Sequence, residues 1–213
     1  EISNIEMIKR IRYTTSHPLD MDQDLILAHK CIKKLMPYLH LPIQSGSDKI
    51  LSSMNRRHTA KQYIQIIEKI RKVNPDIALS GDFIVGYPGE SDKDFNDTIE
   101  LIKHVEYSQS YSFKYSTRPG TPASVLEPQI PEIIKKKRLS ILQEVLFSQQ
   151  SKFNSKFVGK VVDVLIEKDG GRDNQIMGKS QYMQSVYMNH KVGRIGEIKK
   201  IEVSYAGQNS LKA

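Results

Sequence analysis

Hydrophobic and polar positions follow two periods along the first two thirds of the chain. Short apolar runs rich in β-branched and aromatic residues, typical of strands, lie at 10–15, 38–43, 77–85 and 110–115. Between them, apolar residues recur every three or four positions at 22–35, 48–54, 60–73 and 93–105, which predicts amphipathic helices. Strands that alternate with helices of this length form parallel sheets with right-handed crossovers. The pattern therefore predicts an α/β fold.

The pattern changes after the fourth apolar run. Prolines at 119, 122, 128 and 131 are incompatible with regular structure, and a helix is expected from about 131 to 153. From residue 159 onward, β-type pieces at 161–166, 175–179, 185–188 and 196–203 are separated by glycine turns, which predicts a small closed barrel. We therefore expect one domain over 1–153 and a second over 154–213.

Charge is concentrated in the second of these domains. The net charge is +8, and from Lys152 to the end eleven Lys and Arg stand against six Asp and Glu. A small basic barrel suggests a polyanionic partner such as RNA, although a solvated surface without a partner would carry the same charge.

Apolar runs and cysteines restrict the setting of the protein. No apolar run approaches the roughly 20 residues that cross a bilayer, and the first residues lack the pattern of a signal peptide. The single cysteine, Cys31, excludes an internal disulfide and a metal site made of cysteines alone. We therefore expect a cytoplasmic protein that binds no membrane.

Polar and glycine-rich segments follow three of the predicted strands, at 44–47, 86–90 and 116–121. In a parallel α/β barrel the carboxyl ends of the strands build the active site. Small and hydrogen-bonding residues there let a ligand approach the backbone closely. Any one of these segments could be an ordinary turn between a strand and a helix. Three of them in equivalent positions favour a site.

Three segments, at 40–47, 82–90 and 111–122, resemble the radical-SAM methylthiotransferases, and 12–18 with 118–122 are similar to the MiaB-like branch of that family. The resemblance implies the last four of six strands of a partial radical-SAM (β/α) barrel, followed by a TRAM domain, an OB-like all-β barrel. It implies a monomeric tRNA-modifying transferase that methylthiolates C2 of N(6)-dimethylallyladenosine next to the anticodon. S-adenosylmethionine and two 4Fe–4S clusters would be its cofactors, and tRNA its partner.

The resemblance also implies which residues bind. The candidates for the S-adenosylmethionine pocket are Gln44, Ser45, Asp82, Ile84, Gly86 and Arg118. The first three would bond ribose or amino-acid groups, the next two would line the adenine, and the arginine could hold the cofactor carboxylate or a tRNA phosphate. The candidates for RNA binding are Lys152, Lys156, Lys160, Lys179 and Arg194.

The chain departs from the family in its cysteines. Cys31 lies within a helical pattern, and one thiolate cannot hold a cluster, so we expect no metal site and no catalytic residue in this chain. The first two strands, the cluster loop and an N-terminal domain are expected to be absent, and the C-terminal end shortened. Such a fragment would be inactive alone. The alternative is a tRNA-binding module that works without catalysis.

Overall fold

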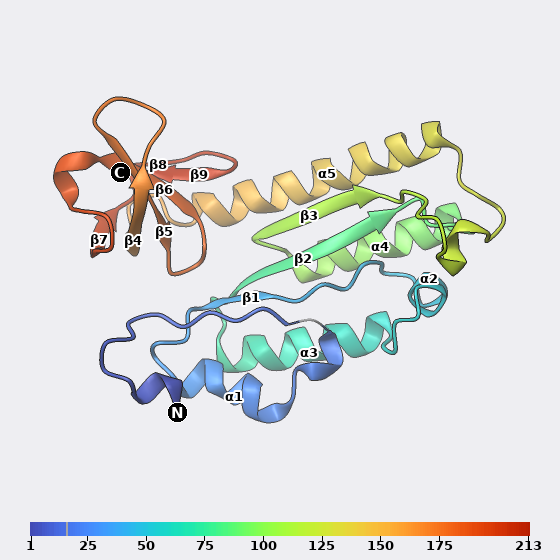
Figure 1. Cartoon of the computed structure of the whole chain (residues 1–213), viewed down its shortest axis with the longest axis horizontal. Coiled ribbons are helices and arrows are strands. Elements are labelled where there is room, and N and C mark those ends of the chain that lie inside the picture. Colours follow the sequence, from blue (N-terminus) through green and yellow to red (C-terminus); the bar gives the residue numbers. More distant parts are fainter. Residues whose placement is uncertain (16) are drawn as a thin grey trace.

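The computed structural model describes residues 1–15 and 17–213 and contains an α/β unit followed by a β-barrel (Figure 1). The helices are α1 Gln23–Cys31, α2 Asp48–Ser53, α3 Ala60–Val73, α4 Asp92–Val105 and α5 Glu132–Ser155, with short 3₁₀ turns at Ile2–Asn4, Pro18–Asp20, Pro122–Ser124 and His190–Val192. The strands are β1 Tyr38–His40, β2 Ala78–Val85, β3 Gln109–Lys114, β4 Val161–Asp169, β5 Gln175–Ser180, β6 Ser185–Asn189, β7 Ile198–Glu202, β8 Tyr205–Ala206 and β9 Ser210–Lys212.

The α/β unit is built on a parallel sheet in the order β1-β2-β3. Along β2, Leu79, Phe83 and Val85 are buried in one core with residues of α3, α4 and α5. Asp82 and Ile84 alternate with them and are only partly buried, so they belong to the opposite face. The expected α/β class and partial barrel are confirmed.

The first predicted strand is not a strand in the structure. Residues 10–15 make only two isolated parallel bridges, Ile11 with Leu35 and Thr14 with His40, and these place the segment beside β1. The side chains of Arg10 and Arg12 instead bind backbone carbonyls of the second unit. The segment therefore occupies the position of a fourth strand without forming a continuous ladder.

Helix boundaries follow from local capping. Thr59 and Gln62 form a capping box at the start of α3, and Ser91 and Asp94 form one at the start of α4. Both helices therefore begin where the sequence pattern places them. Among the described residues, no helix combines the length and the hydrophobicity that a membrane crossing requires.

The second unit is a six-stranded sheet in the order β7-β4-β5-β6-β9-β8. β7 and β8 lie at its two edges and are separated in sequence only by Val203 and Ser204, so one bent stretch of chain joins the edges. Val162, Val164 and Ile166 alternate inward from β4 and pack with residues of the other strands in a separate core. The expected OB-like barrel is confirmed, and β8 and β9 extend it beyond the predicted strands.

The barrel is fixed to the α/β unit at two places. The buried side chain of Asn154, near the end of α5, donates to the carbonyls of Gly207 (3.0 Å) and Gln208 (2.8 Å) and accepts from Nε2 of Gln184 (2.9 Å). In the N-terminal segment, Nη2 of Arg12 donates to the carbonyl of Ser180 at 2.7 Å. The division predicted between residues 153 and 154 lies within the last turn of α5 and stays a prediction.

Candidate functional site

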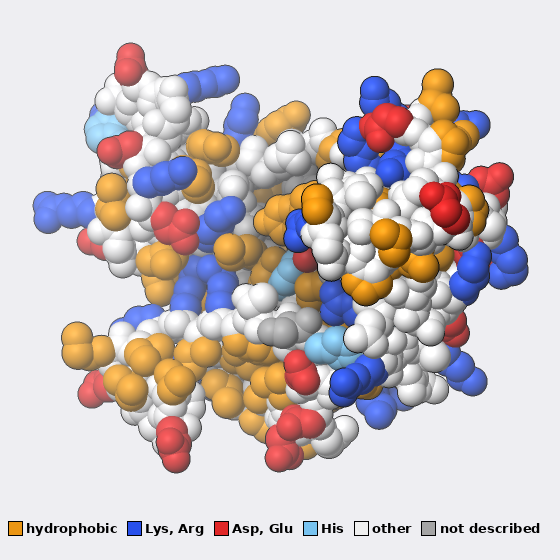
Figure 2. Space-filling view, turned by 45° about the vertical axis from the view of Figure 1, so that its right-hand side comes forward, with side chains coloured by type: hydrophobic (Ala, Val, Ile, Leu, Met, Phe, Trp, Pro, Cys, Tyr) orange, Lys and Arg blue, Asp and Glu red, His pale blue; other side chains and the backbone are white. Residues whose placement is uncertain are grey.

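A cavity of about 770 Å³ lies at the carboxyl ends of β2 and β3. Its lining includes Gln44, Asp82, Ile84 and Arg118, which are four of the six predicted cofactor residues, together with Tyr87, Phe113 and Tyr115. Polar groups therefore meet aromatic and aliphatic side chains in one recess, as in most small-molecule sites. Figure 2 shows the molecule hollowed between its two units, with hydrophobic, His, Lys and Arg side chains in and around the hollow.

Gln44 has a backbone conformation that is rare for its residue type. Its φ is +82°, in the left-handed region that disfavours side chains. Two hydrogen bonds hold it against β2: its N–H donates to the carbonyl of Asp82, and its carbonyl accepts from the N–H of Ile84, both at 3.0 Å. Strained residues of this kind gather at binding sites. The three lining residues are thus fixed to one another through the backbone.

The loop after Gln44 is anchored to α4. Ser45 is fully buried, and its hydroxyl bonds Oγ1 of Thr98 at 3.2 Å. The N–H of Gly46 donates to the same Thr98 oxygen at 2.9 Å. The side chain of Ser45 therefore supports the loop from behind and is not among the residues that line the cavity.

Asp94 ties the same loop to the start of α4. Its carboxylate accepts from the hydroxyl of Ser47 (2.7 Å), from Ser91 and from Nζ of Lys49 (3.1 Å). Burial would raise the pKa of Asp94, but the hydrogen bonds from these partners together hold that pKa well below its usual range. The carboxylate is therefore charged at neutral pH and fastens the loop to the helix.

Gly86 also lies behind the cavity. Its φ is +73°, and an added Cβ would come within 2.5 Å of Cγ of Lys135. Its N–H donates to Oε2 of Glu90 at 2.8 Å, and the same oxygen accepts from Nη1 of Arg138 at 2.7 Å. Only glycine suits this turn. Gly86 is therefore required by the turn and is not among the lining residues.

His40 is a polar residue of this face to which the sequence pattern assigned no role. Its Nδ1 lies 3.0 Å from Oγ of Ser80, and its Nε2 lies 3.6 Å from Oδ2 of Asp82. The ring of Tyr111 meets it edge-on, with 6.2 Å between ring centroids. The signal was available in the sequence: 40, 80, 82 and 111 fall on one face if the strands pair in parallel register.

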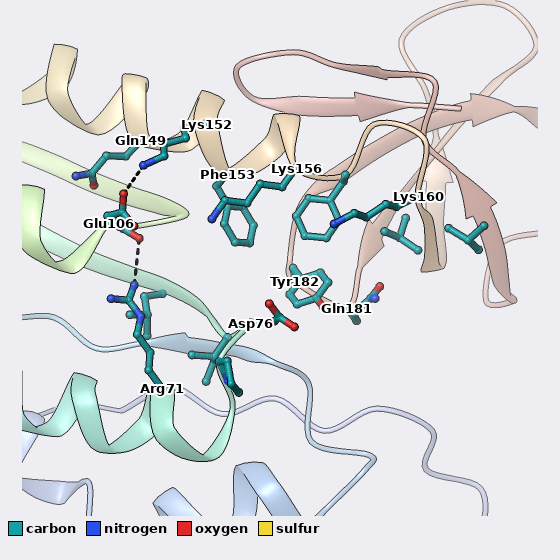
Figure 3. A pocket seen from close by; sticks show the side chains of 16 residues that line it. Arg71, Asp76, Glu106, Gln149, Lys152, Phe153, Lys156, Lys160, Gln181 and Tyr182 are labelled. Atoms are coloured by element: carbon teal, nitrogen blue, oxygen red, sulfur yellow. Dashed lines mark hydrogen bonds and ion pairs between the residues drawn. The ribbon is translucent and has the colours of Figure 1, made fainter.

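The predicted RNA-binding residues divide into two groups. Lys152, Lys156 and Lys160 line a second cavity, of about 410 Å³, at the junction of α5 and the barrel (Figure 3). Lys179 and Arg194 are not among its lining residues. Lys179 is half-buried, its ammonium donates to Oγ of Ser185 at 3.0 Å, and burial lowers its pKa. Arg194 is exposed on the loop before β7.

Two family models match the chain, one within each of the two units of the fold. Residues 1–102 match the radical SAM superfamily, and residues 155–213 match the TRAM domain. The chain is 54% identical, over 212 residues that span all of it, to tRNA-2-methylthio-N(6)-dimethylallyladenosine synthase of Agrobacterium fabrum. The chain belongs to the radical-SAM methylthiotransferase family. It spans 47% of the length of that relative.

A solved structure of another protein superimposes on part of this chain and has a similar fold. Coproporphyrinogen III oxidase from Escherichia coli, described as a radical SAM enzyme, superimposes with a TM-score of 0.50 at 14% sequence identity. The match covers 63% of this chain and 31% of the oxidase. At this identity the likeness supports the shared barrel architecture alone.

The residues described in this chain do not provide the ligands of an iron–sulfur cluster. Cys31 is exposed at the end of α1 and is the one cysteine in the sequence. Within residues 1–15 and 17–213, no three His, Cys, Asp or Glu side chains are grouped so that they could hold a metal ion. A 4Fe–4S cluster needs cysteine thiolates in a set, so its ligands would have to come from outside this chain.

Proposed function

We propose that this chain is the cofactor- and tRNA-binding part of an enzyme that methylthiolates C2 of N(6)-dimethylallyladenosine beside the anticodon of tRNA. The identity of 54% along the whole chain to a synthase of that name carries the proposal. The complete enzyme would be a cytoplasmic monomer. Its two 4Fe–4S clusters would be held by residues outside this chain, and no chemical step is assigned to the residues present.

The cavity at the strand ends fits S-adenosylmethionine. Its volume of about 770 Å³ lies within the usual range for ligand sites, roughly 300–1,000 Å³. Asp82 and Gln44 would bond the ribose or the amino group, and Arg118 the carboxylate, while Ile84 would contact the adenine. Ser45 and Gly86 would act from behind the wall, by holding the loops. The cofactor would supply the methyl group and the means to activate a C–H bond.

Replacing Asp82 with asparagine is expected to weaken S-adenosylmethionine binding about tenfold, because a charge-assisted hydrogen bond contributes roughly 1.5–3 kcal/mol. Isothermal titration calorimetry on the 213-residue chain measures the change. Glu68→Gln, on the exposed side of α3, is the matched control and should leave the affinity unchanged. Equal affinities for wild type and Asp82→Asn would remove Asp82 from the site.

Binding of tRNA is expected to depend steeply on salt. Lys156, Lys160 and Arg194 are exposed, and none has an ion-pair partner within the described part of the chain. If each neutralises one phosphate, affinity should fall about 20- to 40-fold between 50 and 200 mM salt. Filter binding with unmodified and dimethylallylated tRNA measures this fall.

A matched pair of triple variants separates specific contacts from general charge. Changing Lys156, Lys160 and Arg194 to glutamine should weaken tRNA binding and flatten its salt dependence. The same change at the exposed Lys30, Lys33 and Lys72 removes equal charge from the α/β unit and should have little effect. Salt-independent binding, or no binding at 50 mM salt, would contradict a role in tRNA recognition.

A further inference from the structure

The second cavity, which lies at the junction of α5 and the barrel and is called the junction cavity below, has an aromatic wall. Phe153 from the end of α5, Phe157 just after it and Tyr182 from the β5–β6 turn gather there, with ring centroids 5.0 to 6.2 Å apart. All three rings are half-buried, so part of each remains accessible. Figure 3 shows Phe153 and Lys156 entering from α5, and Asp76, Gln181 and Tyr182 approaching from the opposite side.

Charges around this cavity are only partly neutralised. Lys152 pairs with Glu106, and the guanidinium of Arg71 donates to the carbonyl of Val105. Lys156 and Lys160 have no carboxylate within ion-pair distance among the described residues, and Nζ of Lys156 lies 5.8 Å from the ring centre of Phe153. The unpaired ammonium group of Lys156 therefore lies beside an aromatic ring, and Lys160 lines the same cavity.

We propose that the junction cavity binds one unpaired nucleotide, with its base against Phe153 and Tyr182 and its phosphate at Lys156 and Lys160. Aromatic rings beside cationic side chains are the usual platform for single-stranded nucleic acid, since every base has a face that can stack. A duplex keeps its bases stacked within the helix and would leave the rings unused. An acidic peptide would use the two ammonium groups but not the rings.

Polar groups at the opposite side suit the edge of a base. The carboxylate of Asp76 is exposed and makes no hydrogen bond among the described residues, so it can accept from an amino group. Gln181 accepts from the N–H of Asp163 at 3.0 Å, which leaves its amide N–H groups directed elsewhere. A nucleotide here would therefore meet stacking, phosphate and base-edge partners at once.

This site is separate from the cofactor cavity. The junction cavity reaches Ile77 and Leu79 at the start of β2. The cavity proposed for the cofactor reaches Asp82 and Ile84 toward the end of the same strand. The five residue steps along the strand from Leu79 to Ile84 span about 17 Å. The inference rests on the proposed tRNA-binding function if the nucleotide belongs to RNA. A free mononucleotide presents the same chemistry.

Leucine substitutions test the stacking. Phe153→Leu and Tyr182→Leu keep apolar bulk but remove the flat ring, and each should weaken a short single-stranded RNA at least about fivefold. The matched control is Tyr205→Leu. Tyr205 is 57% exposed on β8 and lies beneath Nζ of Lys212, 5.2 Å from its ring centre, but it is outside the cavity. That variant should change affinity less than twofold, and a duplex of the same sequence should not distinguish the ring variants from wild type.

Titration with adenosine 5′-monophosphate distinguishes an RNA strand from a free mononucleotide as the source of the bound nucleotide. Much weaker binding of the mononucleotide than of the RNA assigns the site to an RNA strand. Equal affinity with the same loss in the ring variants assigns it to a free nucleotide. Unchanged RNA affinity in both ring variants, or equal competition by polyglutamate, would overturn the proposal. If the wild-type chain binds tRNA and both ring variants bind RNA with wild-type affinity, the nucleotide site is wrong but the proposed function stands. If the wild-type chain binds no tRNA, the proposed function is wrong.

A second measurement uses the unaltered chain, so it does not depend on a variant that folds. Single-stranded RNA carrying a photoreactive 4-thiouridine is crosslinked to wild type, and the attached peptide is identified by mass spectrometry. Attachment at Phe153 or Tyr182 is expected. Crosslinks confined to residues outside the junction cavity would overturn the proposal.

Discussion

Replacing Arg138 with methionine is expected to lower the free energy of unfolding by roughly 3–5 kcal/mol, because it leaves a buried carboxylate without its partner. The side chain of Glu90 is 1% exposed and that of Arg138 is 7% exposed. The guanidinium donates to Oε2 of Glu90 and to the Glu90 carbonyl, at 2.7 and 3.0 Å. Glu90 in turn holds the N–H of Gly86, so the loss would reach the loop that follows β2.

The pH dependence of the stability of Arg138→Met shows whether the unpaired charge of Glu90 causes the loss. Burial raises the pKa of Glu90 above its ordinary value. An acid whose pKa is raised on folding favours the folded state most at low pH, and that advantage is lost as pH rises through the raised pKa. Without Arg138 the pKa should rise further. The deficit of the variant, measured by urea unfolding, should therefore be smaller near pH 4 than at pH 7.

Two controls bracket this result. Arg57→Met removes an exposed arginine that has no ion pair in the described structure and should cost less than 0.5 kcal/mol, as surface changes do. Adding Glu90→Gln to Arg138→Met removes the buried charge and should restore part of the loss. A deficit that is independent of pH and unaffected by Glu90→Gln would show that lost packing, and not the charge, is responsible.

Replacing Gly46 with alanine is expected to cost about 3 kcal/mol and to weaken S-adenosylmethionine binding as well. An added Cβ would lie 2.5 Å from the carbonyl oxygen of Asp97 and 2.6 Å from Cα of Thr98. Both are backbone atoms of α4, so neither can turn aside, and the loop must move away from the helix. Gln44, two residues earlier, would move with it.

Thermal unfolding and cofactor titration measure the two effects of Gly46→Ala. Gly171→Ala is the matched control, since an added Cβ there meets nothing within 4 Å. It should change neither stability nor affinity appreciably. Loss of stability without loss of cofactor affinity would show that the loop after β1 does not position the cofactor wall.

Local signals in the sequence were sufficient for most of the fold. α3 begins and ends where its pattern and its capping box at Thr59 place it. The segment 10–15 shows the limit of that approach, because its β-type residues predict a strand while its arginines are engaged with the barrel. β8 and β9 have two and three residues, too few for any period to be visible.

The candidate site was predictable to the level of the loops but not of each side chain. Gln44, Asp82, Ile84 and Arg118 do converge on one cavity, as parallel strands require. The orientation of Ser45 depends on Thr98, which lies 53 residues further along the chain. The aromatic wall at the junction likewise joins residues of α5 to the β5–β6 turn, and no local pattern signals such a meeting.

A chimaera tests the central claim most directly. The part of the Agrobacterium fabrum synthase that aligns with this chain is replaced by the 213 residues of this chain, so that the remainder of that enzyme is supplied by the relative. The chimaera is expressed in a bacterium that lacks the synthase, and its tRNA is digested and analysed by mass spectrometry. Our account predicts that 2-methylthio-N(6)-dimethylallyladenosine reappears, and that it is lost again with Asp82→Asn. A folded chimaera that binds tRNA and cofactor but leaves N(6)-dimethylallyladenosine unmodified would contradict it.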